Sequence, residues 1–303
     1  MLARMQRALT IGALLLAGLW FFVLWPAGRP GWAVAGVVLV LLGHAIVLGV
    51  EFMFMGRVNR DDPAPPSSAH QRFAAWWGEA RSAPRVFCWR QPFCSQRWPD
   101  FLPAVVTAGQ SPVRGIVLVH GFVCNRGLWN SWMPRLRAQG IPHVAVNLEP
   151  VFGSIDDYLP IIDAAVRRVE QATGMPPLIV AHSMGGLAVR RWWAGLADDD
   201  LVHHVVTLGT PHRGTWLGRW ALSANTLQMR LGSRWQAQLE EQEKQSHRAK
   251  FTCFYSHCDN IVFPASTATL PGADNRHLAG VAHVQMVDRP QPFEESLRLL
   301  STR

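Results

Sequence analysis

Residues 178–186 read LIVAHSMGG, and this stretch combines a strand, a turn and the start of a helix. The apolar run from Leu178 to Ala181 is typical of a buried parallel strand. Ser183 then stands in a turn among small neighbours, and a helical pattern follows from Leu187 to Leu196. A serine at a sharp strand-to-helix turn needs such neighbours, because larger side chains would clash there. The stretch therefore predicts a strained serine, although a plain Ser/Gly turn at a strand end has the same composition.

Apolar runs on both sides of this stretch have the same character. Ile116 to Val119 precedes it and Val202 to Leu208 follows it, and both read as buried strands. A helix, a strand and a second helix are expected between the first run and the serine, over residues 128–138, 143–148 and 155–172. Strands that alternate with helices predict a parallel sheet with helices on both faces. We expect opening strands at residues 86–93 and 104–107 to pair antiparallel with it and make the sheet mixed.

The N-terminal part of the chain carries two long apolar runs. They extend from about Ala8 to Trp25 and from Trp32 to Met55, and the turn between them reads PAGRPG. Each run is close to the roughly 20 residues that cross a bilayer as a helix. A cleaved signal peptide is the alternative for the first run, but no small-residue cleavage site closes it and a second run follows at once. We therefore expect residues 1–58 to form a transmembrane helical hairpin.

The arginines around the hairpin predict its orientation. Arg4 and Arg7 precede the first run and Arg57 and Arg60 follow the second, against a single Arg29 in the turn. Basic residues favour the cytoplasmic side of a membrane. Both ends of the hairpin, and the domain that follows it, are therefore expected in the cytoplasm.

Residues 59–84 connect the hairpin to the rest of the chain. They begin with RDDPAPPSS, a linker by composition. An amphipathic helix is expected next, with aromatic side chains on one side, namely Phe73, Trp76 and Trp77. The pattern fits a helix on the membrane and equally a helix packed on the domain. Residues 85–303 are long enough for one α/β domain of ordinary size.

The composition limits the partners and the redox chemistry. The formal net charge is +8, mostly through arginine, but there is no run of basic residues and no nucleic-acid-binding motif. An anionic membrane surface is therefore a better partner for this charge than nucleic acid. The five cysteines lack C-x-x-C spacing, which argues against a zinc ribbon or a disulfide framework. We expect free thiols, and two pairings stay open for an oxidising compartment, Cys88 with Cys94 and Cys253 with Cys258.

Three motifs together resemble the α/β-hydrolase superfamily, in particular its bacterial triacylglycerol lipases and lipase-like esterases. They read VHGF at 119–122, AHSMGG at 181–186 and LGTPHRGT at 208–215. Ala181 stands where the common G-x-S-x-G pattern has its first glycine. The resemblance covers roughly residues 113–300 and does not reach the hairpin, which secreted lipases lack. It implies an α/β-hydrolase fold for the domain that follows the hairpin. From the two predicted transmembrane helices ahead of that domain, we expect a protein of the bacterial inner membrane.

The resemblance also assigns a catalytic triad. Ser183 would be the nucleophile, and the family's order along the chain is serine, acid, histidine. Asp259 follows a late apolar strand and precedes IVFP, in a segment similar to the family's acid loop. His283 follows LAGVA and resembles the family's histidine loop. Asp274 and His277 are the alternatives, and His277 is the weaker histidine because it precedes a short apolar strand instead of following one.

The same resemblance implies how negative charge on a substrate would be stabilised. Backbone N–H groups must point to where the oxyanion develops. In the family they belong to the residue after the nucleophile, here Met184, and to the residue after the His-Gly pair, here Phe122. His120 and Gly121 would support this loop without carrying a proton. The other histidines lack the spacing of a zinc site, so we expect no metal ion and no cofactor.

Residues 215–250 form an insertion ahead of the acid loop. Apolar residues recur in it at near-helical spacing, and the charged stretch EEQEK follows. Such an insertion is typical of a lid over a site for acyl chains. An amphipathic helix packed on the core has the same pattern.

Together these features predict a membrane-anchored serine hydrolase that cleaves carboxylic esters of lipids or other apolar acyl compounds through an acyl-enzyme. An acyltransferase with the same triad and a non-catalytic membrane scaffold are the alternatives. The expected partners are a lipid or apolar ester substrate and the bilayer, and no nucleic acid.

Overall fold

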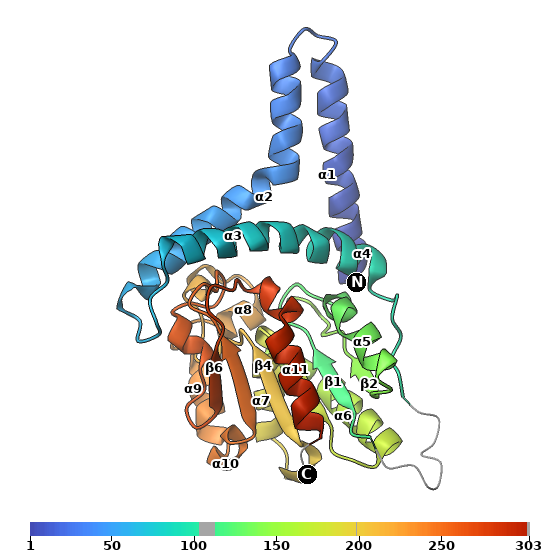
Figure 1. Ribbon diagram of the computed structural model, residues 1–303, viewed down its shortest axis with the longest axis vertical. Coiled ribbons are helices and arrows are strands. Elements are labelled where there is room, and N and C mark those ends of the chain that lie inside the picture. Colours follow the sequence, from blue (N-terminus) through green and yellow to red (C-terminus); the bar gives the residue numbers. More distant parts are fainter. Residues whose placement is uncertain (103–112, 198, 302–303) are drawn as a thin grey trace.

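The computed structural model of the chain describes residues 1–102, 113–197 and 199–301. One sheet has the strand order β2-β1-β3-β4-β5-β6, and all neighbouring strands in it are parallel. The strands are β1 (Ile116–Val119), β2 (His143–Ala145), β3 (Leu178–His182), β4 (His204–Leu208), β5 (Phe251–Tyr255) and β6 (Asp274–His277). The parallel sheet expected from the alternation of strands and helices is confirmed (Figure 1).

Helices cover both faces of the sheet, which explains why its strands are continuous apolar runs. Successive side chains of a strand point to opposite faces. Val117 and Ile179 therefore belong to the core under α6 and α7, whereas Leu118 and Val180 belong to the core under α5 and α11. These helices are α5 (Met133–Ala138), α6 (Leu159–Thr173), α7 (Met184–Ala194) and α11 (Pro290–Leu300).

The insertion between β4 and β5 is a series of short helices. They are the 3-10 helix Trp216–Trp220, α8 (Ala224–Gln228), α9 (Arg234–Gln242) and α10 (Gln245–Arg248). Met229 and Leu239 pack into the core, whereas Leu222 is 97% exposed. The insertion thus combines residues that anchor it with an apolar side chain that points outward.

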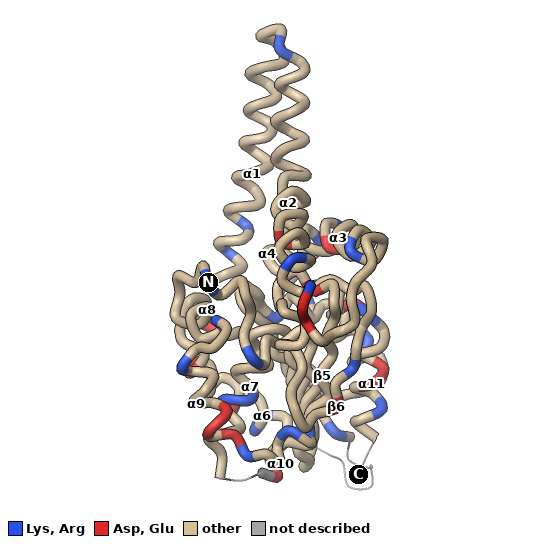
Figure 2. Tube along the Cα trace, turned by 90° about the vertical axis from the view of Figure 1, so that its left-hand side faces the viewer, with Lys and Arg blue, Asp and Glu red and all other residues tan. Residues whose placement is uncertain are grey.

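Two long helices at the N-terminus project away from the sheet. The helices α1 (Leu2–Leu24) and α2 (Pro30–Val58) are long and apolar enough to span a membrane. Charged residues are absent from both helices between Arg7 and Glu51, apart from Arg29 in the connecting turn (Figure 2). A third helix, α3 (Ala69–Pro84), lies across the base of this hairpin, between it and the sheet (Figure 1).

The strand expected at residues 86–93 is wrong. The chain continues from α3 through a π-helical turn, Arg85–Arg90, into α4 (Gln91–Cys94). This region contacts α1 instead of a sheet edge, and Gln6 Nε2 donates to Gln91 Oε1 at 2.9 Å. β-Branched and aromatic residues favour a strand only where a sheet can pair with them, so packing against α1 overrides that preference here.

The mixed sheet expected from the opening strands is also wrong for the part of the chain that the structure describes. Phe101 forms an isolated antiparallel bridge to His143 on β2, and the named strands pair in parallel. The other expected opening strand, residues 104–107, lies outside the described residues.

Candidate active site

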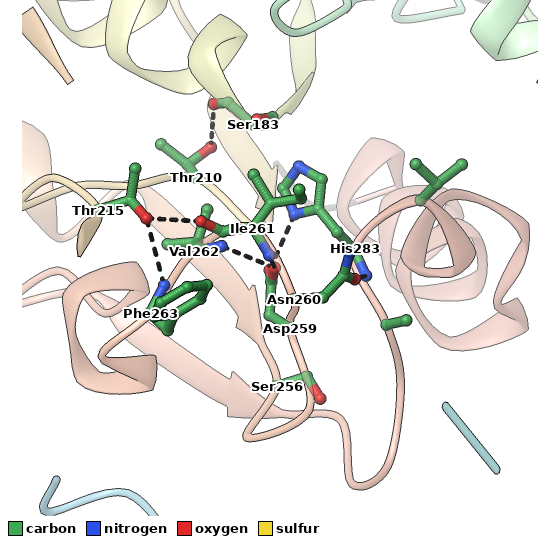
Figure 3. A network of polar contacts seen from close by, with 12 residues as sticks. Ser183, Thr210, Thr215, Ser256, Asp259, Asn260, Ile261, Val262, Phe263 and His283 are labelled. Atoms are coloured by element: carbon green, nitrogen blue, oxygen red, sulfur yellow. Dashed lines mark hydrogen bonds and ion pairs between the residues drawn. The ribbon is translucent and has the colours of Figure 1, made fainter. Parts of the chain in front are cut away.

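Ser183 forms the tip of the turn between β3 and α7. The strand ends at His182 and the helix begins at Met184, and the serine between them has φ 55° and ψ −131°. A positive φ is uncommon for a residue with a side chain and stores strain. The Ser183 N–H donates to the Leu208 carbonyl at 2.9 Å, and the Ser183 carbonyl accepts from the Thr210 hydroxyl at 2.9 Å (Figure 3). These bonds hold the turn in its strained conformation.

Two glycines allow other segments to approach the turn closely. A Cβ atom at Gly121 would lie 2.7 Å from Ser183 Cβ. A Cβ atom at Gly185 would lie 2.5 Å from the carbonyl oxygen of His120. Both distances are shorter than the 3.0 Å below which a Cβ atom clashes with its neighbour. A larger residue at either position would therefore displace the serine or the loop that faces it.

Asp259 and His283 are joined by a hydrogen bond. Nδ1 of His283 lies 2.9 Å from Oδ2 of Asp259, and both side chains are buried. An ionised carboxylate can only accept, so Nδ1 carries the proton and Nε2 is left as an acceptor. The other carboxylate oxygen accepts the N–H groups of Ile261 and Val262, each at 2.8 Å. These bonds fix the carboxylate against the ring.

The ring of His283 lies between Asp259 and Ser183, with its second nitrogen directed toward the serine (Figure 3). Among the described residues, no hydrogen bond joins the Ser183 hydroxyl to this ring. In ligand-free enzymes such contacts are often long and tighten when substrate binds. Burial alone would lower the pKa of His283, but the charge of Asp259 and its hydrogen bond raise it more, so the pKa lies above its usual value.

Two backbone N–H groups beside Ser183 are available to a ligand. Met184 is the first residue of α7, so its N–H has no acceptor within the helix. The N–H of Phe122 likewise donates to no other group in the described parts of the chain. Phe122 and Ser183 line the same cavity. An oxygen that becomes negatively charged near Ser183 could therefore receive two hydrogen bonds.

His120 braces the loop that carries Phe122. Its Nε2 accepts from the Leu148 N–H at 3.0 Å, and its Nδ1 donates to the Gly121 carbonyl at 2.9 Å. Burial lowers the pKa of His120 to about 4, so the ring is neutral near pH 7. Both ring nitrogens are occupied by backbone groups, which fits a supporting residue and not a proton carrier.

Ser183 opens into a cavity of about 650 Å³ with mostly apolar walls. Its large apolar side chains include those of Phe122, Phe152, Leu217, Trp220, Met229 and Val262. The volume lies within the range of small-molecule sites. A larger hollow of about 860 Å³ lies between α2, the linker and α3, and its walls include none of the three triad candidates. The smaller cavity is the one that could hold an apolar chain beside the Ser183 hydroxyl.

The alternative triad members lie away from this cavity. Asp274 begins β6 with a side chain that is 51% exposed, and His277 ends the same strand against the rings of Tyr255 and His257. The apolar strand expected after His277 is not formed. Residues 274–277 make up the strand, because they pair with β5. The structure thus brings Asp259 and His283 together and keeps Asp274 and His277 apart from them.

Polar residues that the sequence did not single out hold the two loops in place. Asn260 Oδ1 accepts the His283 N–H at 3.3 Å, and Asn260 Nδ2 donates to Glu51 Oε2 on α2 at 2.7 Å. Glu79 on α3 accepts from the backbone that follows His283. Asn260 adjoins Asp259 in sequence and could have been suspected. The two glutamates lie more than 200 positions away, and nothing near them in the sequence signals this role.

No protein-family model and no curated protein sequence matches the chain. Solved structures do match it. The mature lipase BlEst2 of Bacillus licheniformis gives a TM-score of 0.57 at 20% identity, over 67% of this chain and 98% of that one. Lipase B of Aspergillus fumigatus gives a TM-score of 0.57 at 18% identity, over 66% of this chain and 55% of its own length. The expected α/β-hydrolase fold is confirmed, with two apolar helices ahead of it.

Proposed function

We propose that this protein is a membrane-anchored serine hydrolase that cleaves carboxylic esters of lipids or other apolar acyl compounds. The observation that carries the proposal is the hydrogen-bonded pair of His283 and Asp259 beside a strained Ser183 at an apolar cavity. The fold similarity to two lipases agrees with this chemistry. The mostly apolar walls of the cavity favour an acyl chain over a charged substrate.

In the proposed mechanism, Ser183 Oγ attacks the ester carbonyl while His283 Nε2 takes its proton. The charge that develops on the carbonyl oxygen is stabilised by the N–H groups of Met184 and Phe122. His283 then returns the proton to the departing alcohol, which leaves an acyl-enzyme. Water, activated by the same ring, releases the acid and regenerates the serine. Asp259 keeps the imidazole oriented and stabilises its charged form.

The anchor in this proposal is the hairpin of α1 and α2, inserted with both ends on the cytoplasmic side of a bacterial inner membrane. Residues 59–84 would connect it to the hydrolase domain, residues 85–303. The insertion at 215–250 would act as a lid, since Leu217, Trp220 and Met229 form part of the cavity wall. A lipid substrate could then pass from the bilayer to the cavity without crossing water.

A fluorophosphonate probe tests the proposal directly, because it reacts with activated serines. We expect the detergent-solubilised full chain to bind about one probe per molecule. Peptide mapping by mass spectrometry should place the label on Ser183. A series of p-nitrophenyl esters should then give the highest kcat/KM for chains long enough to fill the apolar cavity.

Two other results would change the assignment. An ester product formed in the presence of an added alcohol, in place of free acid, would identify an acyltransferase that uses the same residues. A folded protein that takes up no probe and releases no p-nitrophenol would contradict the proposal and favour a membrane scaffold.

A further inference from the structure

The helical region 69–94, which we call the crossing segment, exposes an aromatic and basic face. Phe73, Trp77 and Trp89 are exposed by 63%, 48% and 61%. The exposed side chains of this face follow one another at four-residue intervals, as Phe73, Trp77, Arg81, Arg85, Trp89 and Phe93. Soluble proteins rarely leave so many large apolar side chains together in water.

The opposite face of the crossing segment is buried against the rest of the protein. Ala75, Glu79, Val86 and Gln91 are each at most 1% exposed. Gln285 of the loop after His283 packs against Gly78, which leaves no room for a Cβ atom there. The aromatic and basic face therefore points away from the sheet.

If the hairpin is inserted in a membrane, its length determines how close the bilayer comes to the aromatic and basic face. The crossing segment touches α2 where Trp76 Nε1 donates to the Ala45 carbonyl at 2.8 Å, and it touches α1 where Arg7 donates to the Pro92 carbonyl at 2.8 Å. Beyond these contacts, residues 8–24 and about 30–43 extend roughly 25 and 21 Å at 1.5 Å per residue. The hydrocarbon core of a bilayer is about 30 Å thick. The bilayer would therefore reach down to the crossing segment.

We propose that the crossing segment lies in the headgroup region of an anionic bilayer, with its aromatic side chains at the acyl boundary and Arg81 and Arg85 at lipid phosphates. Trp residues favour this depth, and basic residues gain from anionic lipid there. The arrangement is that of an amphipathic helix lying in the membrane plane. The proposal rests on the hairpin insertion in the proposed function and deepens it. It places the loop of His283, under the inner face of this segment, next to the lipid.

Cys88 provides a probe on this face, since its thiol is free and exposed beside Trp89. The full chain with Cys94→Ser would be labelled there with the fluorophore NBD and reconstituted into vesicles of one part phosphatidylglycerol to three parts phosphatidylcholine. Part of the lipid would carry a nitroxide, either near the headgroup or near the chain end. We expect about twofold stronger quenching by the headgroup-proximal nitroxide. Arg81→Gln with Arg85→Gln should weaken this quenching in the anionic vesicles.

Two matched labels, each in a Cys88→Ser and Cys94→Ser background, separate the outcomes. Leu15→Cys on α1 reports insertion of the hairpin, and Ser246→Cys on α10 reports the end of the domain opposite the hairpin (Figure 1). Quenching at Leu15→Cys, with Cys88 no more quenched than Ser246→Cys, would overturn the placement of the crossing segment and leave the anchor intact. Absence of quenching at Leu15→Cys as well would overturn the anchor and this proposal together.

The inner face of the crossing segment carries a buried carboxylate, that of Glu79. The Glu79 carboxylate is 1% exposed and accepts the N–H groups of Val284 at 2.9 Å and Gln285 at 3.2 Å. These are the two residues after His283. Burial raises the pKa of Glu79 to about 7, even though both hydrogen bonds and the charge of His283 lower it. The charge of Asp259 also raises the pKa of Glu79.

The geometry points to Glu79 as a positioning residue that fixes the backbone of His283 and so the direction of its ring. The role presupposes the triad of the proposed function. A backbone that carries a catalytic ring need shift by only about 1 Å to cost on the order of 100-fold in rate. Glu79 reaches this backbone from a helix outside the sheet, so the crossing segment would help to set the active-site geometry.

Glu79→Ala is expected to lower kcat by about 10- to 100-fold with little change in KM, and Glu79→Gln by less, because its amide oxygen can still accept. Above about pH 7 Glu79 is ionised and its charge raises the pKa of His283, so both variants should move that part of the acid limb of the pH profile to lower pH. Rates would be normalised to sites titrated with fluorophosphonate, so that unfolded protein does not count. The matched control is Glu295→Gln, a buried carboxylate that pairs with Arg276 and Arg298.

An unchanged kcat and pH profile per titrated site would overturn this role. A loss of kcat in Glu295→Gln as large as that in the Glu79 variants would overturn it as well. Wild-type protein that takes up no probe would instead contradict the proposed function itself.

Discussion

Replacing Ser183 with alanine is expected to reduce kcat for ester hydrolysis by about 10⁵- to 10⁶-fold, to the level that binding and oxyanion stabilisation alone provide. Without the hydroxyl no acyl-enzyme can form. His283→Ala should cause a loss of similar size, because the serine then has no base. The double variant should be no worse than either single one, since both changes remove the same step. A p-nitrophenyl ester assay on purified full-length protein measures all three.

Asp259→Asn completes this series and adds a pH dependence. It should lower kcat by about 10³- to 10⁴-fold, because the amide no longer holds the ring in its productive tautomer. His283 must be neutral to accept the serine proton, so activity rises with pH through the pKa of the ring. Asp259 raises that pKa. Its replacement should therefore move the acid limb of the profile to lower pH.

The matched controls are the alternative acid and base. Asp274→Asn and His277→Ala change the same residue types on β6, away from the cavity, and should keep wild-type kcat. If His277→Ala were as damaging as His283→Ala, or Asp274→Asn as damaging as Asp259→Asn, the triad would have to be reassigned.

Local sequence signals were enough for the parallel strands β1 to β5 and for the turn of Ser183. A short apolar run that ends in small residues around a serine constrains the backbone within a few residues, and the strained φ of 55° lies where the pattern puts it. The proximity of Asp259 and His283 follows from a motif order and a common sheet edge. In a parallel sheet, the loops that follow the carboxyl ends of the strands meet at one edge.

Other features depend on contacts that no local pattern carries. Residues 86–93 have the composition of a strand, but α1 is their partner and they are helical. The carboxylate of Glu79 bonds to a backbone 205 positions away, and a buried glutamate cannot be recognised before its surroundings are known. His277 was expected ahead of a strand and ends one, because pairing with β5 selects the polar residues 274–277 over the apolar ones that follow.

Arg190 on α7, the helix that follows Ser183, forms a buried ion pair on which we expect the stability of the protein to depend strongly. Its guanidinium makes two hydrogen bonds to Glu243, Nε to Oε1 at 2.8 Å and Nη2 to Oε2 at 2.9 Å, and both side chains are at most 1% exposed. A third bond runs from Arg190 Nη1 to the His212 carbonyl at 2.8 Å. Glu243 directly follows α9 within the insertion at 215–250, so this pair ties the candidate lid to α7.

Arg190→Met or Glu243→Gln is expected to destabilise the protein by about 3–5 kcal/mol, because each leaves the other group buried with its main charge partner lost. Burial alone would raise the pKa of Glu243, and the bonds from Arg190 and Arg248 lower it more, so the carboxylate is charged in the folded protein. At about 2–4 °C per kcal/mol for a domain of this size, the apparent Tm should fall by roughly 6–20 °C. Thermal unfolding in detergent, followed by circular dichroism, measures the shift.

The double variant Arg190→Met with Glu243→Leu separates two quantities. One is the contribution of the ion pair to the free energy of unfolding, and the other is the penalty for leaving one buried charge unpaired. Apolar residues of similar volume remove both fully buried charges. Arg248 also loses its bond to Glu243, but its side chain is 12% exposed, so we expect a smaller loss than in either single variant. Arg168→Met is the surface control. Arg168 is 54% exposed in its ion pair with Asp100, and this pair should contribute at most about 1 kcal/mol to the free energy of unfolding. If the single variants were as mild as Arg168→Met, the lid would not depend on this pair. If the double variant lost as much as either single one, packing around the ion pair, and not charge, would hold the insertion to α7.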